Sequence, residues 1–205
     1  MEQTLSPDGT LLAYGNGLWE IATGKQIKKL AIPEGLIYEI KFSPDGKTLA
    51  YWLCESLAQN TSMIVLVDVP SGKKVFQIGD FGVEISNFCF RSPATFSADG
   101  KRIAFSELGS PPDYPIHLWS VSGNKEVQRI PQKTYADLLA FSADGRTLSS
   151  WDRPHGLVHL WETATGKERR AVKLGGGVRS LTFSPDGRAV ALVKDGTIEF
   201  RKLGE

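Results

Sequence analysis

Apolar and polar residues alternate along most of this chain, and short turn sequences interrupt the alternation at intervals. Residues 38–42 read YEIKF, with apolar residues at the first, third and fifth positions. Residues 139–141 and 181–183 repeat this spacing later in the chain. Because a period of two residues places successive side chains on opposite faces, the pattern predicts half-buried β-strands rather than helices.

A turn sequence of four residues follows these strands and occurs five times, as SPDG or SADG. Proline at the second position presets φ, and glycine takes the left-handed conformation that closes a bulged hairpin turn. The copies are spaced by 37, 54, 45 and 42 residues and end at Gly9, Gly46, Gly100, Gly145 and Gly187. This spacing is centred near the ~40–45 residues of a four-stranded repeat unit.

Each turn leads into a second strand with a fixed arrangement of side-chain sizes. The third residue after the turn glycine is apolar in all five copies, and the fourth residue is small. A small side chain at this place predicts that the strand lies close to its neighbours, because a larger one would hold them apart. The small residues are Ala13, Ala50, Ala104, Ser149 and Ala191.

A third and a fourth strand complete the repeat. The third strand alternates in register at 64–66, 116–118, 158–160 and 198–200, and three units end it in Leu-Trp. A turn such as ATGK then leads to a basic, half-apolar fourth strand, which we interpret as an outer edge where charge discourages aggregation. The carboxylates that end the third strand are interpreted as turn-stabilising groups; they are Glu20, Asp68 and Glu162.

These repeats resemble the WD-repeat β-propeller family. The matching stretches are FSPDGKTLA from Phe42, IHLWSVSGNK from Ile116 and FSADGRTLSSWDRPHGLVHLWETATGKE from Phe141, and the resemblance covers essentially the whole chain. The resemblance implies a radial array of four-stranded sheets, used mainly as a rigid platform for contacts between proteins. The copy SADGKRIAFS is also similar to periplasmic translocation-protein propellers, but the Leu-Trp and Thr-Gly-Lys elements favour the WD type.

Two features depart from the pattern of that family. The family often has a Gly-His pair before the first strand, and none of His117, His155 and His159 occupies that place. The tryptophan of the third strand is replaced by Val67 in the second unit and by Arg201 in the fifth. The family's hydrogen-bonded set of His, Ser or Thr, Asp and Trp is therefore not carried over to this chain.

The predicted fold is all-β, a β-propeller built from four-stranded antiparallel blades, with about five units of which the first and the last are incomplete. The first unit has only MEQTLS for its inner strand, and the last ends after its third strand. Seven blades are the family norm, so we expect part of a larger propeller; a five-bladed ring or an open arc is the alternative. The approximate units are 1–32, 33–80, 81–131, 132–174 and 175–205.

Composition and charge narrow the class of protein. The 205 residues include 24 basic and 23 acidic side chains, so the chain lacks the basic excess of a protein that binds nucleic-acid phosphates. No apolar run reaches the ~20 residues that span a bilayer, and the first residues lack the features of a secretory signal. Cys54 and Cys89 have no metal-binding spacing and are expected to be buried free thiols. The chain is therefore predicted to be cytoplasmic, with no nucleic-acid or membrane partner.

No catalytic residue, metal site or cofactor is predicted. The TGK turns lack the earlier glycine of a phosphate-binding loop, and no G-x-S-x-G, H-E-x-x-H or calcium-loop motif is present. His117 and His159 occupy the same position in their repeats, just before Leu-Trp. We interpret them as strand residues that repetition has produced, and not as ligands.

Candidate binding residues lie in the connections between strands, because variable loops on a rigid scaffold commonly carry binding sites. The connections that start at residues 54, 107 and 151 are long and individual, and the segment 131–137 is expected on the same face. Tyrosine, tryptophan and arginine dominate interface hot spots. The candidate partner-binding residues are therefore Tyr114, Tyr135, Trp151 and Arg153. The alternative for each is a solvated loop residue or, for Trp151, packing between blades.

The favoured hypothesis is a non-enzymatic scaffold that binds a protein of unknown identity through loops on one propeller face. The alternative is a propeller fragment of a larger enzyme or signalling protein, which regulates a catalytic domain outside this chain. A propeller that binds a small ligand or hydrolyses it is the weakest hypothesis, because no convergent polar set is found. Residues 197–202 form a further candidate site, where an exposed edge strand could pair with a strand of another chain.

Overall fold

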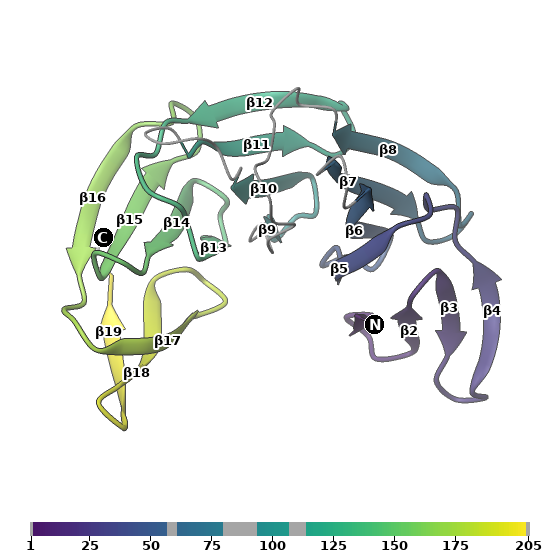
Figure 1. The fold of residues 1–205 in the computed structure, drawn as a ribbon, viewed down its shortest axis with the longest axis horizontal. Coiled ribbons are helices and arrows are strands. Elements are labelled where there is room, and N and C mark those ends of the chain that lie inside the picture. The colour runs from purple at the N-terminus through teal and green to yellow at the C-terminus, as the bar shows by residue number, and fades with distance from the viewer. Residues whose placement is uncertain (1, 57–60, 80–93, 107–113, 204–205) are drawn as a thin grey trace. The chain divides into compact units, whose positions relative to one another are not determined.

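The computed structural model of the chain describes residues 2–56, 61–79, 94–106 and 114–203. This described part contains strands and no helix (Figure 1). All strand pairs are antiparallel, and every sheet is made of strands that are consecutive in the chain. The all-β class predicted from the alternating sequence pattern is confirmed.

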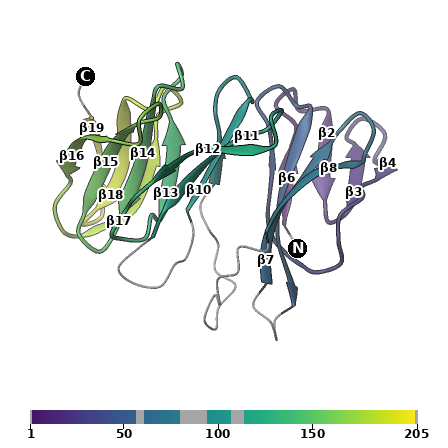
Figure 2. The same cartoon turned by 90° about the horizontal axis from the view of Figure 1, so that it is seen from above.

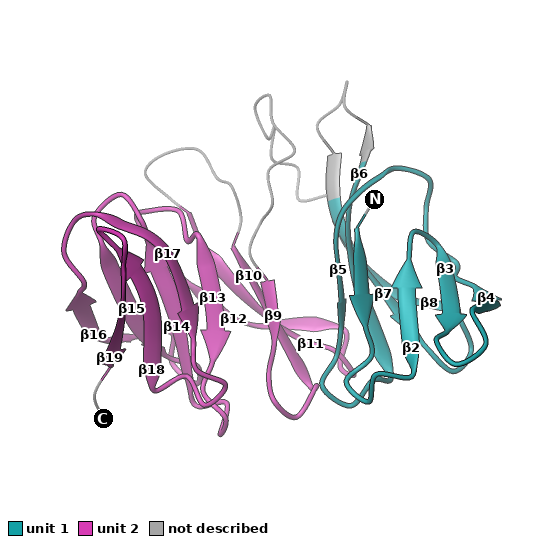
Figure 3. Ribbon diagram, turned by 90° about the horizontal axis from the view of Figure 1, so that it is seen from below, with its two compact units in different colours: residues 1–91 teal, residues 92–205 magenta. Residues whose placement is uncertain are grey.

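The first of two compact units comprises residues 1–91 and contains two four-stranded sheets (Figure 3). The first sheet contains, in order across it, β1 (Gln3–Leu5), β2 (Leu11–Tyr14), β3 (Gly17–Glu20) and β4 (Lys25–Lys29). The second sheet contains β5 (Leu36–Phe42), β6 (Thr48–Ser56), β7 (Thr61–Asp68) and β8 (Lys74–Gly79). Each strand pairs with the next strand in the chain.

The second unit comprises residues 92–205 and contains three sheets. The third sheet contains β9 (Ala94–Phe96), β10 (Arg102–Ser106), β11 (Ile116–Ser120) and β12 (Lys125–Ile130). The fourth contains β13 (Leu138–Phe141), β14 (Thr147–Asp152), β15 (Leu157–Glu162) and β16 (Glu168–Lys173). The fifth has three strands, β17 (Val178–Phe183), β18 (Ala189–Lys194) and β19 (Thr197–Lys202).

The strand order within each repeat follows the prediction, with one exception at the start of the chain. The fifth sheet ends after its third strand, as expected. The first sheet was expected to be incomplete, and this is wrong because β1 supplies its inner strand. This strand is only three residues long, but it pairs with β2 along its whole length, from Gln3 opposite Tyr14 to Leu5 opposite Leu12.

The five Ser-x-Asp-Gly sequences form one turn with nearly the same geometry in every copy. The glycine N–H donates to the serine carbonyl at 2.8–2.9 Å, and the glycine φ lies between 66° and 72°. The serine hydroxyl donates to the aspartate at 2.6–2.7 Å. The backbone N–H two residues after the aspartate donates to the same carboxylate. These hydrogen bonds lower the pKa of Asp8, Asp45, Asp99, Asp144 and Asp186.

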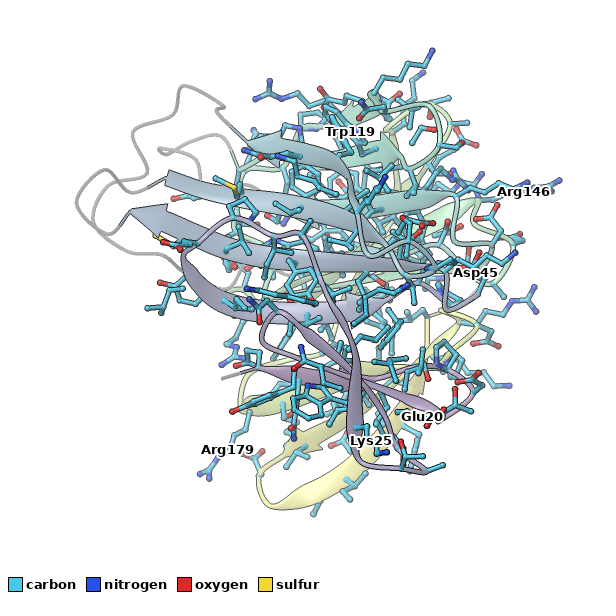
Figure 4. The ribbon with its side chains drawn as sticks, turned by 90° about the vertical axis from the view of Figure 1, so that its right-hand side faces the viewer. Glu20, Lys25, Asp45, Trp119, Arg146 and Arg179 are labelled. Carbon is cyan, nitrogen blue, oxygen red and sulfur yellow. The ribbon has the colours of Figure 1, made fainter. Side chains whose placement is uncertain are left out.

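The turns after the third strands depend on carboxylates in the way that the sequence predicted. Thr23 donates its hydroxyl to Glu20 at 2.7 Å, and Glu20 and Lys25 flank this turn in Figure 4. Thr165 donates to Glu162 at 2.7 Å in the fourth sheet. The equivalent bond in the second sheet is donated by the hydroxyl of Ser71 to Asp68. The interpretation of these acids as turn-stabilising groups is confirmed.

Each sheet has two faces, which we name by the side chains of its second strand. The small-residue face carries the small residue that lies four positions after the turn glycine, together with its cross-strand neighbours. The large-residue face carries the apolar residue that precedes it. In the fourth sheet Ser149 pairs with Leu160 on the small-residue face, and Leu148 pairs with Trp161 on the large-residue face.

Within each unit, the small-residue face of one sheet packs against the large-residue face of the next. In the first unit, Ala13 and Leu18 form a core cluster with Leu49 and Tyr51 of the second sheet. In the second unit, two clusters of the same kind join the third sheet to the fourth and the fourth to the fifth. Figure 2 shows the ribbons of the fourth and fifth sheets side by side. Ala13, at the first of these junctions, is completely buried. The close packing predicted at the small residue is therefore found there.

Cys54, a buried residue of β6, is disulfide-bonded, so the expectation of a free thiol is wrong for this residue. The other cysteine of the chain, Cys89, lies outside the described residues. Because disulfides persist mainly in oxidising compartments, the cysteines no longer favour a cytoplasmic location. Among the described residues, no helix has the length and apolar character needed to cross a membrane.

Candidate partner-binding site

A tight connection joins β14 to β15 at one end of the strands of the fourth sheet. Asp152 closes β14 opposite Leu157, and the N–H of Gly156 donates to the carbonyl of Arg153 at 3.1 Å. On the neighbouring side, the N–H of Asp137 donates to the carbonyl of Trp151 at 2.8 Å. These bonds hold together the surface that we call the fourth-sheet rim, residues 135–137 and 151–156.

A buried carboxylate organises the fourth-sheet rim. Asp152 is 2% exposed, and its Oδ1 accepts a hydrogen bond from the backbone N–H of His155 at 3.1 Å. Its Oδ2 lies 2.8 Å from Nδ1 of the same histidine and 3.8 Å from Nε2 of His159. Because a buried charge needs hydrogen-bond partners, Asp152 orders the loop around itself rather than presenting its charge to solvent.

Arg153 projects from the rim toward solvent, with 54% of its side chain exposed. Its guanidinium carbon lies 4.8 Å from the centre of the Trp151 ring, and its Nε lies 3.2 Å from Oδ1 of Asp137. Burial raises the pKa of Asp137; the positive charge of Arg153 opposes this shift, and the negative charge of Asp152 adds to it. Stacking and ion pairing hold the guanidinium in one place, where its planar set of donors can meet an incoming carboxylate.

Trp151 is a core residue, as its packing alternative predicted. The ring is 2% exposed and lies in the cluster that joins the fourth and fifth sheets, with Val158 and Leu181. A partner could reach this ring only if the core opened. Trp151 contributes to the site through the contact of its ring with the Arg153 guanidinium.

Tyr114 and Tyr135 are half buried and lie on adjoining connections of the third and fourth sheets. The N–H of Tyr114 donates to the carbonyl of Gln132 at 2.8 Å, which ties the end of the β10–β11 connection to the segment before β13. Tyr135 begins the fourth-sheet rim. Most of the connection that starts at residue 107, and the tip of the one that starts at residue 54, lie outside the described residues.

A buried hydrogen-bond chain supports the rim, and the sequence did not predict it. Nε1 of Trp161 donates to Oγ of Ser150 at 2.8 Å, and this hydroxyl donates to Oε1 of Gln132 at 2.9 Å. Nε2 of Gln132 donates in turn to the carbonyl of Thr134 at 2.6 Å. The signal in the sequence was Trp161 itself, because a buried indole N–H needs an acceptor. Gln132 therefore links Ser150 to the backbone of Thr134, and no histidine takes part in these hydrogen bonds.

His117 and His159 each pair with a glutamate on the adjacent fourth strand. Nδ1 of His117 lies 2.8 Å from Oε1 of Glu126, and Nδ1 of His159 lies 2.8 Å from Oε1 of Glu168. The same contact in two sheets supports the interpretation of both histidines as products of the repeat. The described part of the chain brings together no group of three or more His, Cys, Asp or Glu side chains that could hold a metal ion.

Comparisons with known proteins give a likeness in fold. No family model matches the chain, and no curated protein matches it in sequence. Among solved structures, a chain of hydrazine synthase from Kuenenia stuttgartiensis is similar, with a TM-score of 0.66 and 20% sequence identity. The likeness covers 93% of this chain and 54% of that chain, so this chain spans about half the length of the solved one. At this level of identity the likeness concerns the fold alone.

Proposed function

We propose that the five sheets are blades of a WD-type β-propeller and that the chain is a non-enzymatic module that binds another protein. Support for the propeller comes from the repeated strand order and from the packing of one sheet face on the next within each unit. The repeated Ser-x-Asp-Gly turns and the Leu-Trp pairs add support from the sequence.

The fourth-sheet rim is the observation that carries the binding proposal. Arg153 is accessible, yet its guanidinium is already held by the Trp151 ring and by Asp137. Because its position is set before a partner arrives, binding would cost little side-chain entropy. Tyr135 belongs to the rim, and the N–H of Tyr114 donates to Gln132 in the segment that leads into the rim. Tyrosine and arginine are enriched at interface hot spots. The partner that this surface fits is a protein with an exposed carboxylate beside an apolar patch.

The test is affinity purification of the tagged chain from its own cells, quantified by mass spectrometry. The test variant is Tyr135→Ala/Arg153→Glu, because changing Trp151 would disturb the core. Arg170→Glu is the matched control, since Arg170 is an exposed basic residue on β16, outside the rim. We expect a set of proteins that the wild type and the control retain and that the rim variant loses at least tenfold.

Two outcomes would contradict this proposal. The rim variant could retain the same proteins as the wild type, which would place the binding surface elsewhere. The second outcome is that the wild type enriches no protein above the resin background. The urea midpoints of all three proteins have to agree before the comparison is made, so that unfolding is not mistaken for lost binding.

A second candidate is a regulatory propeller within a larger enzyme or signalling protein. The observation in its favour is that the similar solved chain, from an enzyme, is about twice as long as the part that this chain matches. Purification of the protein from its own cells, followed by measurement of its intact mass, distinguishes the two candidates. A mass well above 22.5 kDa favours the regulatory candidate.

A further inference from the structure

The connection between β16 and β17 lies against the fourth-sheet rim. The N–H of Leu174 donates to the carbonyl of Gly156 at 2.9 Å, and a Cβ on Gly156 would lie 2.7 Å from the carbonyl oxygen of Gly175. Gly156 has a φ of 63°, so this place requires glycine both for its left-handed backbone and for the close approach. The rim therefore continues into three consecutive glycines, residues 175–177, which we call the glycine segment.

Lys194 of β18 reaches the glycine segment from the fifth sheet. Its Nζ lies 3.1 Å from the place that a Cβ of Gly175 would occupy. Because Lys194 follows the buried Leu192 by two residues, it lies on the face of the fifth sheet that packs on the fourth. The lysine is half buried, and among the described residues no carboxylate pairs with its ammonium group. A partly buried charge without an opposite charge costs free energy, so this group is suited to a carboxylate from outside the chain.

Arg153 and Lys194 are thus two cationic groups at the junction of the fourth and fifth sheets, connected by the contacts of Gly156 and Gly175. Acidic side chains lie beside both cations. Asp137 pairs with Arg153, and Oδ1 of Asp195 lies 2.8 Å from the place that a Cβ of Gly177 would occupy. The continuous phosphates of a nucleic acid would meet these carboxylates, whereas a peptide can place neutral residues opposite them. The surface therefore favours a peptide with separate carboxylates.

We propose that this surface binds an acidic segment of the partner protein, with one carboxylate on Arg153, another on Lys194 and the main chain of the segment over the glycines. The inference rests on the proposed function and names the chemistry of the partner. Hydrogen bonds from a cationic group to a carboxylate are among the strong ones in proteins. Glycines without side chains let an extended peptide approach the backbone closely.

Gly176, in the middle of the glycine segment, provides the sharpest test. Its φ is not in the left-handed region, and a Cβ there would have nothing within 4 Å, so a side chain at this position leaves the fold undisturbed. Gly176→Glu places a negative charge on the proposed surface, and Gly176→Lys places a positive one there. Lys194→Gln removes one of the two cations.

Arg146→Gln is the matched control for the loss of one positive charge. Arg146 is exposed and precedes β14, whereas the rim follows β14, so it lies at the other end of the fourth sheet. Figure 4 shows Arg146 on the opposite side from Arg179, which follows the glycine segment by two residues. This control separates the proposed surface from the overall charge of the protein.

The measurement is fluorescence anisotropy of a short labelled peptide, in which glutamate alternates with serine, titrated with the full chain at low ionic strength. We expect the wild type to bind the peptide and Arg146→Gln to bind it equally well. Lys194→Gln and Gly176→Glu should each weaken binding about threefold, and Gly176→Lys should strengthen it about as much. Added salt should weaken binding, because exposed charges are screened.

Three results would overturn the inference. They are a wild type that does not bind the peptide, equal affinities of Gly176→Glu and Gly176→Lys, and tighter binding of an oligothymidylate of the same charge. Affinity purification with Gly176→Glu separates this inference from the proposed function. If this variant retains every protein that depends on the rim, the acidic segment is wrong and the binding function stands. A wild type that retains no protein removes the function and the inference with it.

Discussion

Two glycines of the repeated turn have the same backbone conformation and different surroundings. Gly9 has a φ of 72° and Gly187 a φ of 69°, so a side chain at either position meets the same local strain. A Cβ on Gly9 would have nothing within 4 Å, whereas on Gly187 it would lie 2.8 Å from Cα of Ser142 and 3.0 Å from the carbonyl of Phe141. Gly187 therefore lets the fifth sheet approach the backbone of the fourth.

We predict that Gly9→Ala lowers the free energy of unfolding by about 1–2 kcal/mol, the cost of a left-handed alanine. Gly187→Ala should cost about 1–3 kcal/mol more, because the methyl group must displace backbone atoms of Ser142. Urea unfolding of both variants, compared at a common m-value, gives the difference. Equal losses in the two variants would mean that the sheets yield without cost at this contact.

Two neighbouring serines of β14 also have different surroundings. The hydroxyl of Ser150 receives the Trp161 N–H and donates to Gln132, whereas the hydroxyl of Ser149 is buried with no hydrogen-bond partner. Ser150→Ala leaves two buried polar groups without a partner and should cost about 1–3 kcal/mol. Ser149→Ala removes an unsatisfied group and should leave stability unchanged or raise it, as alanine at this place in other units suggests. Thermal unfolding of both variants tests this, and a larger loss for Ser149→Ala would contradict it.

At the scale of the elements, the five Ser-x-Asp-Gly turns make the fold sensitive to acid. Hydrogen bonds to the ionised carboxylates hold the pKa of all five aspartates below their ordinary value of 3.8. A group whose pKa is lowered on folding stabilises the protein above its unfolded pKa and loses that contribution as the pH falls through the folded value. The five aspartates therefore stabilise the fold fully at neutral pH, and all five lose this contribution in acid.

We predict that the urea midpoint is nearly constant from about pH 7 to pH 5 and falls steeply below about pH 4. Asp144→Asn should reduce this slope, because the amide still accepts the Ser142 hydrogen bond but has no proton to gain. Equilibrium unfolding over this pH range provides the measurement. A midpoint that stays constant to about pH 2.5 would show that the turns hold equally well with neutral aspartates.

The strands and turns were predictable because their causes are local. Alternation of period two and a turn with proline, aspartate and glycine in fixed places need no knowledge of distant residues. The first sheet was misjudged because three residues of β1 suffice for pairing, and so short a strand leaves almost no pattern. The close packing at Ala13 was predictable too, because a small residue repeated at a fixed place implies a neighbour.

At the scale of the whole molecule, the site was less predictable than the fold. The sequence indicated the connections and the residue types, but Trp151 is buried whereas Arg153, two residues later, is exposed. Residues two apart share a face within a strand, so their opposite exposures depend on the end of β14 at Asp152, which alternation alone does not indicate. Gln132 was not predicted to take part because a glutamine in a loop has no characteristic spacing from the tryptophan that it supports through Ser150.

The disulfide at Cys54 shows the same limit, since cysteine spacing says little about distance in space. We predict that both cysteines of the unfolded, unreduced protein resist alkylation and that both react after reduction. Reduction should also lower the free energy of unfolding by about 2–4 kcal/mol. Intact mass spectrometry with and without reductant counts the alkyl groups, and a non-reducing gel distinguishes a bond within one chain from a bond between two. Alkylation of Cys54 before reduction would contradict the prediction and would make the reducing cytoplasm the favoured location again.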